Sequence, residues 1–325
     1  MDSVQINSIH NFDLKKFDSP KINTDSVHSL QNVLKSEIGK LSRQEKIRIL
    51  LQTIRFIDLT TLAGDDSWVN VNRLCWRAVH PITDVLKQEI KSLGFKGSED
   101  LHVGAVCVYP ARVNDCHRAF KEFQLDPVKI ACVVTGFPSG QFGLESRLIE
   151  IKYASECDAD EIDVVINRAL ALDGDWNGVY EEIKMMRRAS PNMRMKVILE
   201  VGELGSLQNV YKASWAAMLA GADFIKTSTG KVSTNATLPV GMVMCRAINE
   251  FFLETGIKVG FKPAGGLKTE ADCLCWYKLI EWQLGEDWLE PCLFRIGASS
   301  LLNEIEKSLF KYFFNRQPEI YELSV

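Results

Sequence analysis

Short, strongly apolar runs alternate along this chain with longer segments in which apolar residues recur every three or four positions. The short runs have the length and composition of buried strands, and eight of them lie near Arg55 to Leu59 and at Val103 to Tyr109, Ile130 to Thr135, Glu161 to Ile166, Met195 to Val201, Phe224 to Thr227, Val259 to Lys262 and Phe294 to Ile296. The longer segments predict amphipathic helices, among them Glu145 to Cys157, Val179 to Arg188, Asn209 to Leu219, Val240 to Leu253 and Ala271 to Gln283. Because each helix lets successive strands run parallel, the alternation predicts an α/β fold, a (β/α)8 TIM barrel spanning about 270 residues.

A doubly wound open sheet is the alternative fold for the same alternation. No G-x-G-x-x-G follows the first predicted strand, which counts against the dinucleotide site that often marks such sheets. No linker divides the pattern, so we expect a single barrel domain over residues 46–325, with a tail at its C-terminus.

The first residues are polar and weakly patterned, and we interpret residues 1–45 as an extension packed outside the barrel or partly disordered. One helix is expected within it, over Val27 to Ile38, with Thr24 or Asp25 as its cap and Gly39 as its stop.

A second helix is predicted directly after the extension. Ser42 to Glu45 has the sequence of a capping box, and this helix should lead into the first strand.

Composition narrows the class of protein. The 325 residues are 46% hydrophobic and 25% charged, with a formal net charge of −4 that offers no basic surface for nucleic acid or for an anionic membrane. No stretch approaches the ~20 apolar residues of a membrane span, and the polar N-terminus lacks the apolar core of a secretory signal. Nine cysteines, without a C-x-x-C pair, suit a reducing compartment, so we expect a cytoplasmic protein with neither a nucleic-acid nor a membrane partner.

Histidines are absent from the predicted strand ends. A zinc-dependent carbon-carbon lyase would need a cluster of them there, so the sequence favours a mechanism without metal or other cofactor. The five histidines are instead scattered, at His10, His28, His80, His102 and His117.

Lysines inside the apolar runs are the main candidates for chemistry. Lys226 lies in a predicted buried strand, and removing an ammonium from water costs several kcal/mol unless its pKa falls. A neutral buried amine attacks carbonyls to form a Schiff base. A single such lysine would more often reach water with its end or form a structural ion pair. Lys196, Lys262 and Asp163 occupy matching positions on other strands, however, so we expect the four side chains to converge and the cations to lower each other's pKa.

Polar residues also follow the strands, where barrel enzymes carry their active sites. Asp58 and Thr60 end the first strand, Cys107 the second, and Glu200 the fifth. The hydroxyls and Asn167 would equally serve to satisfy turn backbone groups.

Glycine-rich turns follow the last three strands and predict a phosphate site. Bare backbone N–H groups and a helix N-terminus bind anions, and barrel phosphate sites are often built after strands seven and eight. The predicted substrate is therefore a small phosphorylated molecule, and its candidate ligands are Thr229, Gly230, Lys231, Gly265, Gly266, Lys268, Gly297, Ser299 and Ser300.

These motifs resemble the class I, Schiff-base-forming deoxyribose-phosphate aldolases. The resemblance runs through roughly residues 50 to 305 and rests on Asp58 to Leu62, Cys107 to Pro110, Glu161 to Val165, Phe224 to Lys231, Gly260 to Gly266 and Arg295 to Ser300. It implies reversible cleavage of 2-deoxyribose 5-phosphate, as in deoxyribonucleoside catabolism. It further implies that Lys226 forms the imine, that Lys262 perturbs it, that Asp163 is the acid of a proton relay and that Lys196 hydrogen-bonds within that relay.

Some positions depart from the bacterial pattern of that family. Gly136 stands where asparagine is common and Lys268 where arginine is common, and with the long extension these features resemble the eukaryotic branch. Bacterial members can end in a catalytic tyrosine, whereas here Tyr321 is followed by Glu-Leu-Ser-Val.

Two rival classes share parts of this pattern. A barrel isomerase or another imine-forming aldolase would share the phosphate loops, and a non-catalytic sugar-phosphate binder would need no buried amine. Association into a homo-oligomer is left open by the sequence.

Overall fold

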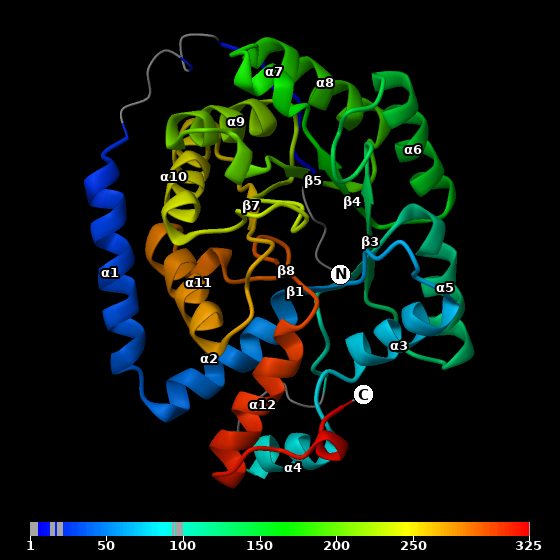
Figure 1. Cartoon of the computed structure of the whole chain (residues 1–325), viewed down its shortest axis with the longest axis vertical. Helices are drawn as coiled ribbons and strands as arrows, with labels where there is room; N and C mark the ends of the chain where they lie inside the picture. Colours follow the sequence, from blue (N-terminus) through cyan, green and yellow to red (C-terminus); the bar gives the residue numbers. More distant parts are fainter. Residues whose placement is uncertain (1–5, 14–16, 18–21, 93, 95–99, 325) are drawn as a thin grey trace.

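The computed structural model describes residues 6–13, 17, 22–92, 94 and 100–324. Its centre is a sheet of eight parallel strands in the order β7-β6-β5-β4-β3-β2-β1-β8, surrounded by helices (Figure 1). This arrangement confirms the predicted (β/α)8 barrel. The strands are β1 (Ile57–Thr60), β2 (Ala105–Val108), β3 (Lys129–Val134), β4 (Glu161–Val165), β5 (Arg194–Ile198), β6 (Phe224–Lys226), β7 (Gly260–Lys262) and β8 (Ile296–Ala298).

The barrel closes between β7 and β8 through isolated bridges instead of a continuous ladder. Phe261 pairs with Phe294, and Ala264 pairs with Gly297. The apolar pattern predicted the last strand at Phe294 to Ile296, but β8 begins only at Ile296, where its ladder with β1 starts. The first strand also begins later than predicted, because the helix before it continues to Phe56.

The helices named from the periodicity are all present, with ends that shift by less than one turn. The α-helices in the described part of the chain are α1 (Thr24–Lys40), α2 (Arg43–Phe56), α3 (Trp68–Val79), α4 (Asp84–Ser92), α5 (Val113–Glu122), α6 (Leu144–Glu156), α7 (Arg168–Leu172), α8 (Trp176–Ala189), α9 (Leu207–Leu219), α10 (Leu238–Thr255), α11 (Glu270–Gln283) and α12 (Leu301–Phe314). A 3₁₀ turn, η5 (Ile320–Glu322), follows in the tail.

The caps of the first two helices test the N-terminal predictions. Asn23 caps α1, because its side-chain oxygen accepts a hydrogen bond from the backbone N–H of Ser26 at 3.0 Å. The predicted caps Thr24 and Asp25 were wrong, since both lie inside the first turn, and α1 runs one residue past the glycine predicted to stop it. The capping box at Ser42 is confirmed and opens α2.

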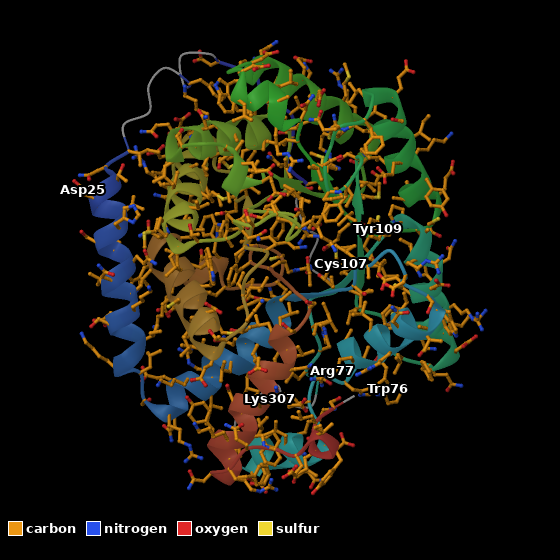
Figure 2. The ribbon with its side chains drawn as sticks, viewed as in Figure 1. Asp25, Trp76, Arg77, Cys107, Tyr109 and Lys307 are labelled. Atoms are coloured by element: carbon orange, nitrogen blue, oxygen red, sulfur yellow. The ribbon has the colours of Figure 1, made fainter. Side chains whose placement is uncertain are left out.

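The helix of the N-terminal extension lies outside the barrel. α1 runs alongside α10 and α11, with Leu34 buried in that contact and Asp25 at the outer edge (Figures 1 and 2). The division of the chain at residue 45 stays a prediction. The alternative of partial disorder concerns residues 1–5, 14–16 and 18–21, which lie outside the described residues.

Residues 6–13 contact a part of the barrel that is more than 200 positions away in the sequence. The side-chain amide of Asn7 donates to the carbonyls of Met218 and Ala222 at 3.0 and 2.9 Å, and its backbone N–H donates to Asp223 at 2.7 Å. Asp223 directly precedes β6. The segment around Asn7 is therefore anchored at the end of the barrel where the strands begin.

The barrel interior has an apolar part and a charged part. The apolar part is a small cluster, separate from the large core between strands and helices, made by Leu62, Ala105, Cys107, Ala131, Val133, Phe137, Val165 and Ile198. Most of these residues come from β2 to β5. Charged side chains from β1 and from β4 to β8 fill the remaining space, and they build the site.

Candidate active site

The four residues predicted to carry the chemistry converge inside the barrel. Asp163 on β4 is their common partner: its Oδ2 lies 2.7 Å from the Nζ atoms of both Lys226 and Lys262, and its Oδ1 lies 2.9 Å from Lys196 Nζ. The strand register produces this geometry, because Asp163 is opposite Lys196 and Lys226 is opposite Lys262. All four side chains are buried.

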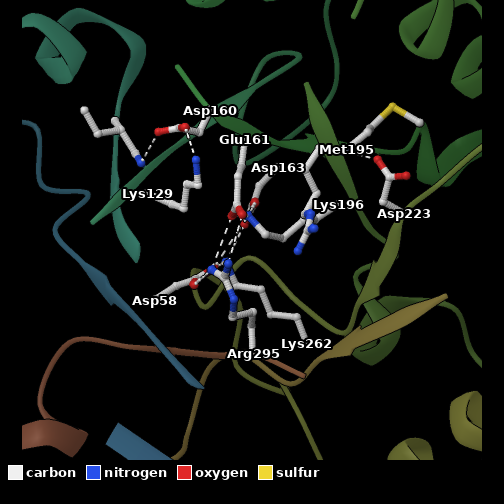
Figure 3. A network of polar contacts seen from close by, with 12 residues as sticks. Asp58, Lys129, Asp160, Glu161, Asp163, Met195, Lys196, Asp223, Lys262 and Arg295 are labelled. Carbon is white, nitrogen blue, oxygen red and sulfur yellow. Dashed lines mark hydrogen bonds and ion pairs between the residues drawn. The ribbon is translucent and has the colours of Figure 1, made fainter. Parts of the chain in front are cut away.

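Three further charged groups complete a single network (Figure 3). Asp58 on β1 contacts Lys262 and Arg295, and Glu161 on β4 contacts Lys196 at 2.7 Å and Arg295 at 2.9 Å. Arg295, just before β8, joins the two carboxylates and is 3% exposed.

Lys226 is the lysine with a lowered pKa. Burial lowers it most, the Asp163 carboxylate opposes this effect, and the Lys262 ammonium lowers it further. Lys226 is 3% exposed, and its amine lies in an environment that favours its uncharged, nucleophilic form.

The prediction that the three cations lower each other's pKa was wrong for Lys196 and Lys262. Burial would lower both values, but Asp163 and the further carboxylates outweigh it and raise the pKa of each lysine. Lys262 contacts two carboxylates, Asp58 and Asp163, and Lys196 contacts Glu161 as well. Two charged lysines therefore flank the one that is easily deprotonated.

The carboxylates of the network stay ionised because the neighbouring cations lower their pKa values. Burial alone would raise the pKa of Asp163, but Lys196, Lys226 and Lys262 lower it well below its usual range. The pKa of Glu161 is also lowered, because Arg295 and Lys196 outweigh burial.

Sequence reasoning gave no role to Glu161 or to Arg295. Glu161 is two residues before Asp163 on the same strand, so the period of two places both carboxylates on one face, and this was a usable signal. Arg295 carried no comparable signal, because its partners lie 134 and 237 residues away in the sequence.

A cavity of about 250 Å³ opens above the network at the carboxyl ends of the strands. Lys226 lines it together with most of the residues predicted to bind substrate, namely Thr60, Thr229, Gly230, Lys231, Gly265, Gly266, Lys268, Gly297, Ser299 and Ser300. Three segments that follow β6, β7 and β8 thus meet the amine in one space. Whether these residues bind substrate stays a prediction.

Asp58 and Cys107 were also predicted to bind substrate, but neither lines this cavity. Asp58 is fully buried under Lys262 and acts on that lysine. Cys107 is buried near the barrel centre, where Figure 2 shows it beside Tyr109, and burial raises the pKa of its thiol. Sequence reasoning placed both residues at strand ends, but their side chains face the interior.

Backbone geometry explains several of the glycines. Gly265 and Gly266 both have positive φ, at 82° and 85°, and a Cβ on Gly265 would meet the side chain of Asn235 at 2.6 Å. A Cβ on Gly297 would lie 2.8 Å from that of Ala264 and 3.2 Å from the Lys262 side chain. Glycine at this position lets β8 approach Lys262 closely.

The polar residues named at strand ends divide between two roles. Asn167 caps α7, accepting from the backbone N–H of Ala169 at 3.2 Å, as the structural alternative proposed. Glu200 is buried with a positive φ of 55°, and it accepts a hydrogen bond from the backbone N–H of Thr229 at 3.2 Å. Thr229 lines the cavity, so Glu200 holds the turn that follows β6.

Metal-binding clusters and membrane-spanning helices are both absent from the described residues. No group of three or more His, Cys, Asp or Glu side chains among them is arranged to hold a metal ion. Within the same residues, no helix combines the length and the apolar character that crossing a membrane requires.

A deprotonatable lysine among fixed charges, at the carboxyl end of a parallel barrel and beside glycine turns, is the arrangement of an imine-forming barrel enzyme. Its sequence relatives agree: residues 53–276 match the DeoC/LacD family of aldolases, and this chain belongs to that family. It is therefore an aldolase, a carbon-carbon lyase.

Individual relatives cover most of the chain. Mouse deoxyribose-phosphate aldolase is 52% identical over 275 residues, which cover 84% of this chain and 85% of the mouse protein. The human deoxyribose-phosphate aldolase is 50% identical over 274 residues, with the same coverage. A solved structure from Toxoplasma gondii has a TM-score of 0.71, covers 83% of this chain and 97% of its own, and at 21% identity supports the fold alone.

Proposed function

We propose that this chain reversibly cleaves 2-deoxy-D-ribose 5-phosphate to D-glyceraldehyde 3-phosphate and acetaldehyde, with Lys226 as the imine-forming residue. The observation that carries the proposal is the position of Lys226: its amine, whose pKa is lowered, lines the same cavity as the glycine turns after β6 and β7 and the serines after β8. The names of the mouse and human relatives support the choice of substrate.

The first step is attack of the neutral Lys226 amine on C1 of the open-chain aldehyde. Loss of water gives a protonated imine in which C2 is α to the imine carbon and C3 bears a hydroxyl. Lys262 stays charged and contacts the same oxygen of Asp163 as Lys226. Its positive charge therefore disfavours protonation of the Lys226 amine.

The second step breaks the C2–C3 bond. A water held by Asp163 and Lys196 takes the proton of the C3 hydroxyl, a C3 carbonyl forms, and the bonding electrons move into the protonated imine. Glyceraldehyde 3-phosphate leaves, and an acetaldehyde enamine remains on Lys226. Asp163 suits this role because its cationic neighbours keep it ionised.

The last step returns the free enzyme. The enamine takes a proton at C2, water hydrolyses the resulting imine, and acetaldehyde is released with regeneration of the Lys226 amine. The same steps in reverse join the two products.

The phosphate occupies the glycine-lined end of the cavity in this proposal. Ser299 and Ser300 lie directly before α12, a helix of 14 residues whose N-terminus favours an anion. Gly266 has open space where a Cβ would project, so its backbone can approach the phosphate. Lys231 and Lys268 add positive charge along the cavity wall.

We further propose a cytoplasmic location, supported by nine cysteines that are all free thiols. No cofactor, nucleic acid or membrane takes part in the proposed reaction. Association into a homo-oligomer stays a prediction, which light scattering on the purified protein would test.

A coupled assay tests the function directly. The chain is incubated with 2-deoxyribose 5-phosphate, and acetaldehyde is measured through its reduction by alcohol dehydrogenase and NADH. We expect steady acetaldehyde release that ends in the Lys226→Leu variant. Isomerisation of the sugar phosphate without acetaldehyde would support a barrel isomerase, and binding without turnover would support a sugar-phosphate binder.

A further inference from the structure

The charged network holds more cations than anions. Its members contact one another in an unbroken chain of ion pairs, and they are the cations Lys196, Lys226, Lys262 and Arg295 and the carboxylates of Asp58, Glu161 and Asp163. If every group were ionised, four positive charges would face three negative ones among buried side chains. Such an excess is costly in a buried site.

Loss of one proton removes the excess, and the contacts indicate which group gives it up. Arg295 cannot lose a proton in a protein, and Lys262 and Lys196 contact two carboxylates or more. Lys226 contacts only Asp163 among the network carboxylates. It is therefore the cation whose deprotonation costs least.

Arg295 supplies the fourth positive charge of the network and cannot release it by losing a proton. Without it, three lysines would face three carboxylates, and the network would be neutral with Lys226 charged. We propose that Arg295 is a positioning residue for the aldolase reaction: as the fourth cation, bound to Asp58 and Glu161, it makes the uncharged amine of Lys226 the state that balances the network. This inference rests on the proposed role of Lys226 as the nucleophile.

The place of Arg295 excludes direct contact with the substrate. It does not line the cavity that contains Lys226, and it lines a separate cavity of about 470 Å³ together with Glu161, Lys129 and His102. Its two ion pairs connect β8 to β1 and β4 (Figure 3). Its effect on Lys226 must therefore pass through the carboxylates between them.

Two further cations, Lys231 and Lys268, line the same cavity as Lys226, but Lys231 donates to the carbonyl of Leu62 and no ion pair joins either lysine to a carboxylate of the network. Lys226 faces Asp163 from β4, Lys262 from β7 and the Cys107 thiol from β2, whose pKa is raised so that it stays neutral. Arg194 on β5 influences Glu161, but its guanidinium donates to the carbonyl of Cys292 and packs over an aromatic ring, outside the ion pairs of the network.

The test follows the pH dependence of imine formation. Initial rates of trapping by acetaldehyde and cyanoborohydride are measured by intact mass across pH for the wild type and four variants. The midpoint is the pH at which the trapping rate reaches half of its maximum. We expect Arg295→Gln to move this midpoint up by about one pH unit, a small shift because Arg295 acts through intervening groups. Glu161→Gln should move it down, and the double variant should restore it. Arg295→Lys, which keeps the charge, should remain near the wild type.

A purely structural role predicts a different pattern. Loss of packing alone would lower trapping at every pH in both single variants without moving the midpoints in opposite directions. As a matched control, Arg77→Gln removes a buried arginine that pairs with Glu306 outside the network, and it should leave the midpoint unchanged.

The results that would contradict the role of Arg295 differ from those that would contradict the proposed function. An unchanged midpoint in folded Arg295→Gln, or shifts of the same sign in both single variants, would overturn the inference. If Arg295→Gln does not fold, the double variant must still have a higher midpoint than Glu161→Gln, and equal midpoints would overturn it. If the wild type shows no trapping on the peptide containing Lys226, the proposed function itself fails.

Discussion

At the scale of single residues, Asp163 is the group on which the site depends. One of its oxygens contacts both Lys226 and Lys262, and the other contacts Lys196. A carboxylate beside charged lysines has little tendency to bind a proton itself. It can instead orient a water molecule and accept its proton only transiently, which suits the bond-breaking step and the protonation of the enamine.

Asp163→Asn should separate imine formation from proton transfer. We expect proton exchange at C2 of acetaldehyde to fall by about 10²-fold or more, while trapping of the imine on Lys226 persists. NMR in D₂O measures the exchange, and mass spectrometry measures the adduct. Asp160→Asn, a nearby carboxylate that pairs with Lys129 outside the site, is the control. Equal losses of exchange and trapping would contradict the assigned role.

Ser299→Asp tests the phosphate end of the cavity. A carboxylate at the start of α12 would repel the substrate phosphate, so we expect KM for 2-deoxyribose 5-phosphate to rise roughly tenfold or more, equivalent to about 1.4 kcal/mol of binding. Ser299→Asn has nearly the same shape without the charge and should change KM much less. Equal KM values in the two variants would place the phosphate elsewhere.

The residues that could be predicted from sequence share one property. Lys226, Lys262, Lys196 and Asp163 are charged residues inside apolar runs, a conflict visible without any structure. Arg295 lies at the edge of such a run, and its function depends on partners from strands far away in the sequence. Only the folded barrel shows that Arg295 adds a positive charge to this network, because the barrel places these strands side by side.

At the scale of elements, the apolar periodicity was sufficient to predict the barrel. The periodicity did not predict the exact first and last residues of the elements, because a single hydrogen bond can set where an element begins or ends. Asn23 rather than Thr24 caps α1, because its side chain reaches the N–H of Ser26. β8 is shorter than its apolar run, because the seam with β7 is formed by isolated bridges. Such details depend on contacts that periodicity does not encode.

The segment of residues 6–13 had no sequence signal, yet it has its own anchor on the barrel. Asn7→Ala would remove the amide that donates to the carbonyls of Met218 and Ala222, of which Met218 keeps the backbone N–H of Gly221, so we expect a loss of about 1–3 kcal/mol in the free energy of unfolding. Urea denaturation followed by circular dichroism measures it. Ser8→Ala, at an exposed neighbouring position, is the control, and equal stability of the two variants would contradict the anchor.

At the scale of the whole molecule, the barrel interior divides between packing and chemistry. The apolar cluster of β2 to β5 stabilises one part, while the other holds seven charged side chains in mutual contact. A buried ionic network contributes little to stability compared with apolar packing, because desolvation offsets much of the attraction. The division is what an enzyme needs that must keep one amine uncharged among fixed charges.

The network should give stability a defined dependence on pH. The folded pKa of Asp163 is lowered, so its stabilising contribution is fully present above its unfolded value of about 3.9 and is lost as pH falls through the folded value. We expect the difference in melting temperature between the wild type and Asp163→Asn to be constant from about pH 5 to 8 and to shrink below about pH 4. A difference that stays constant below pH 4 would contradict the ionised state of Asp163.

The most direct test of the central claim is the covalent identity of the imine. Borohydride added with acetaldehyde should leave an irreversible two-carbon adduct on the peptide that contains Lys226, and nothing should be trapped without the aldehyde. Lys226→Leu should abolish both the adduct and the cleavage of 2-deoxyribose 5-phosphate. An adduct on Lys196 or Lys262 instead, or full activity in Lys226→Leu, would contradict the assignment of Lys226 as the nucleophile.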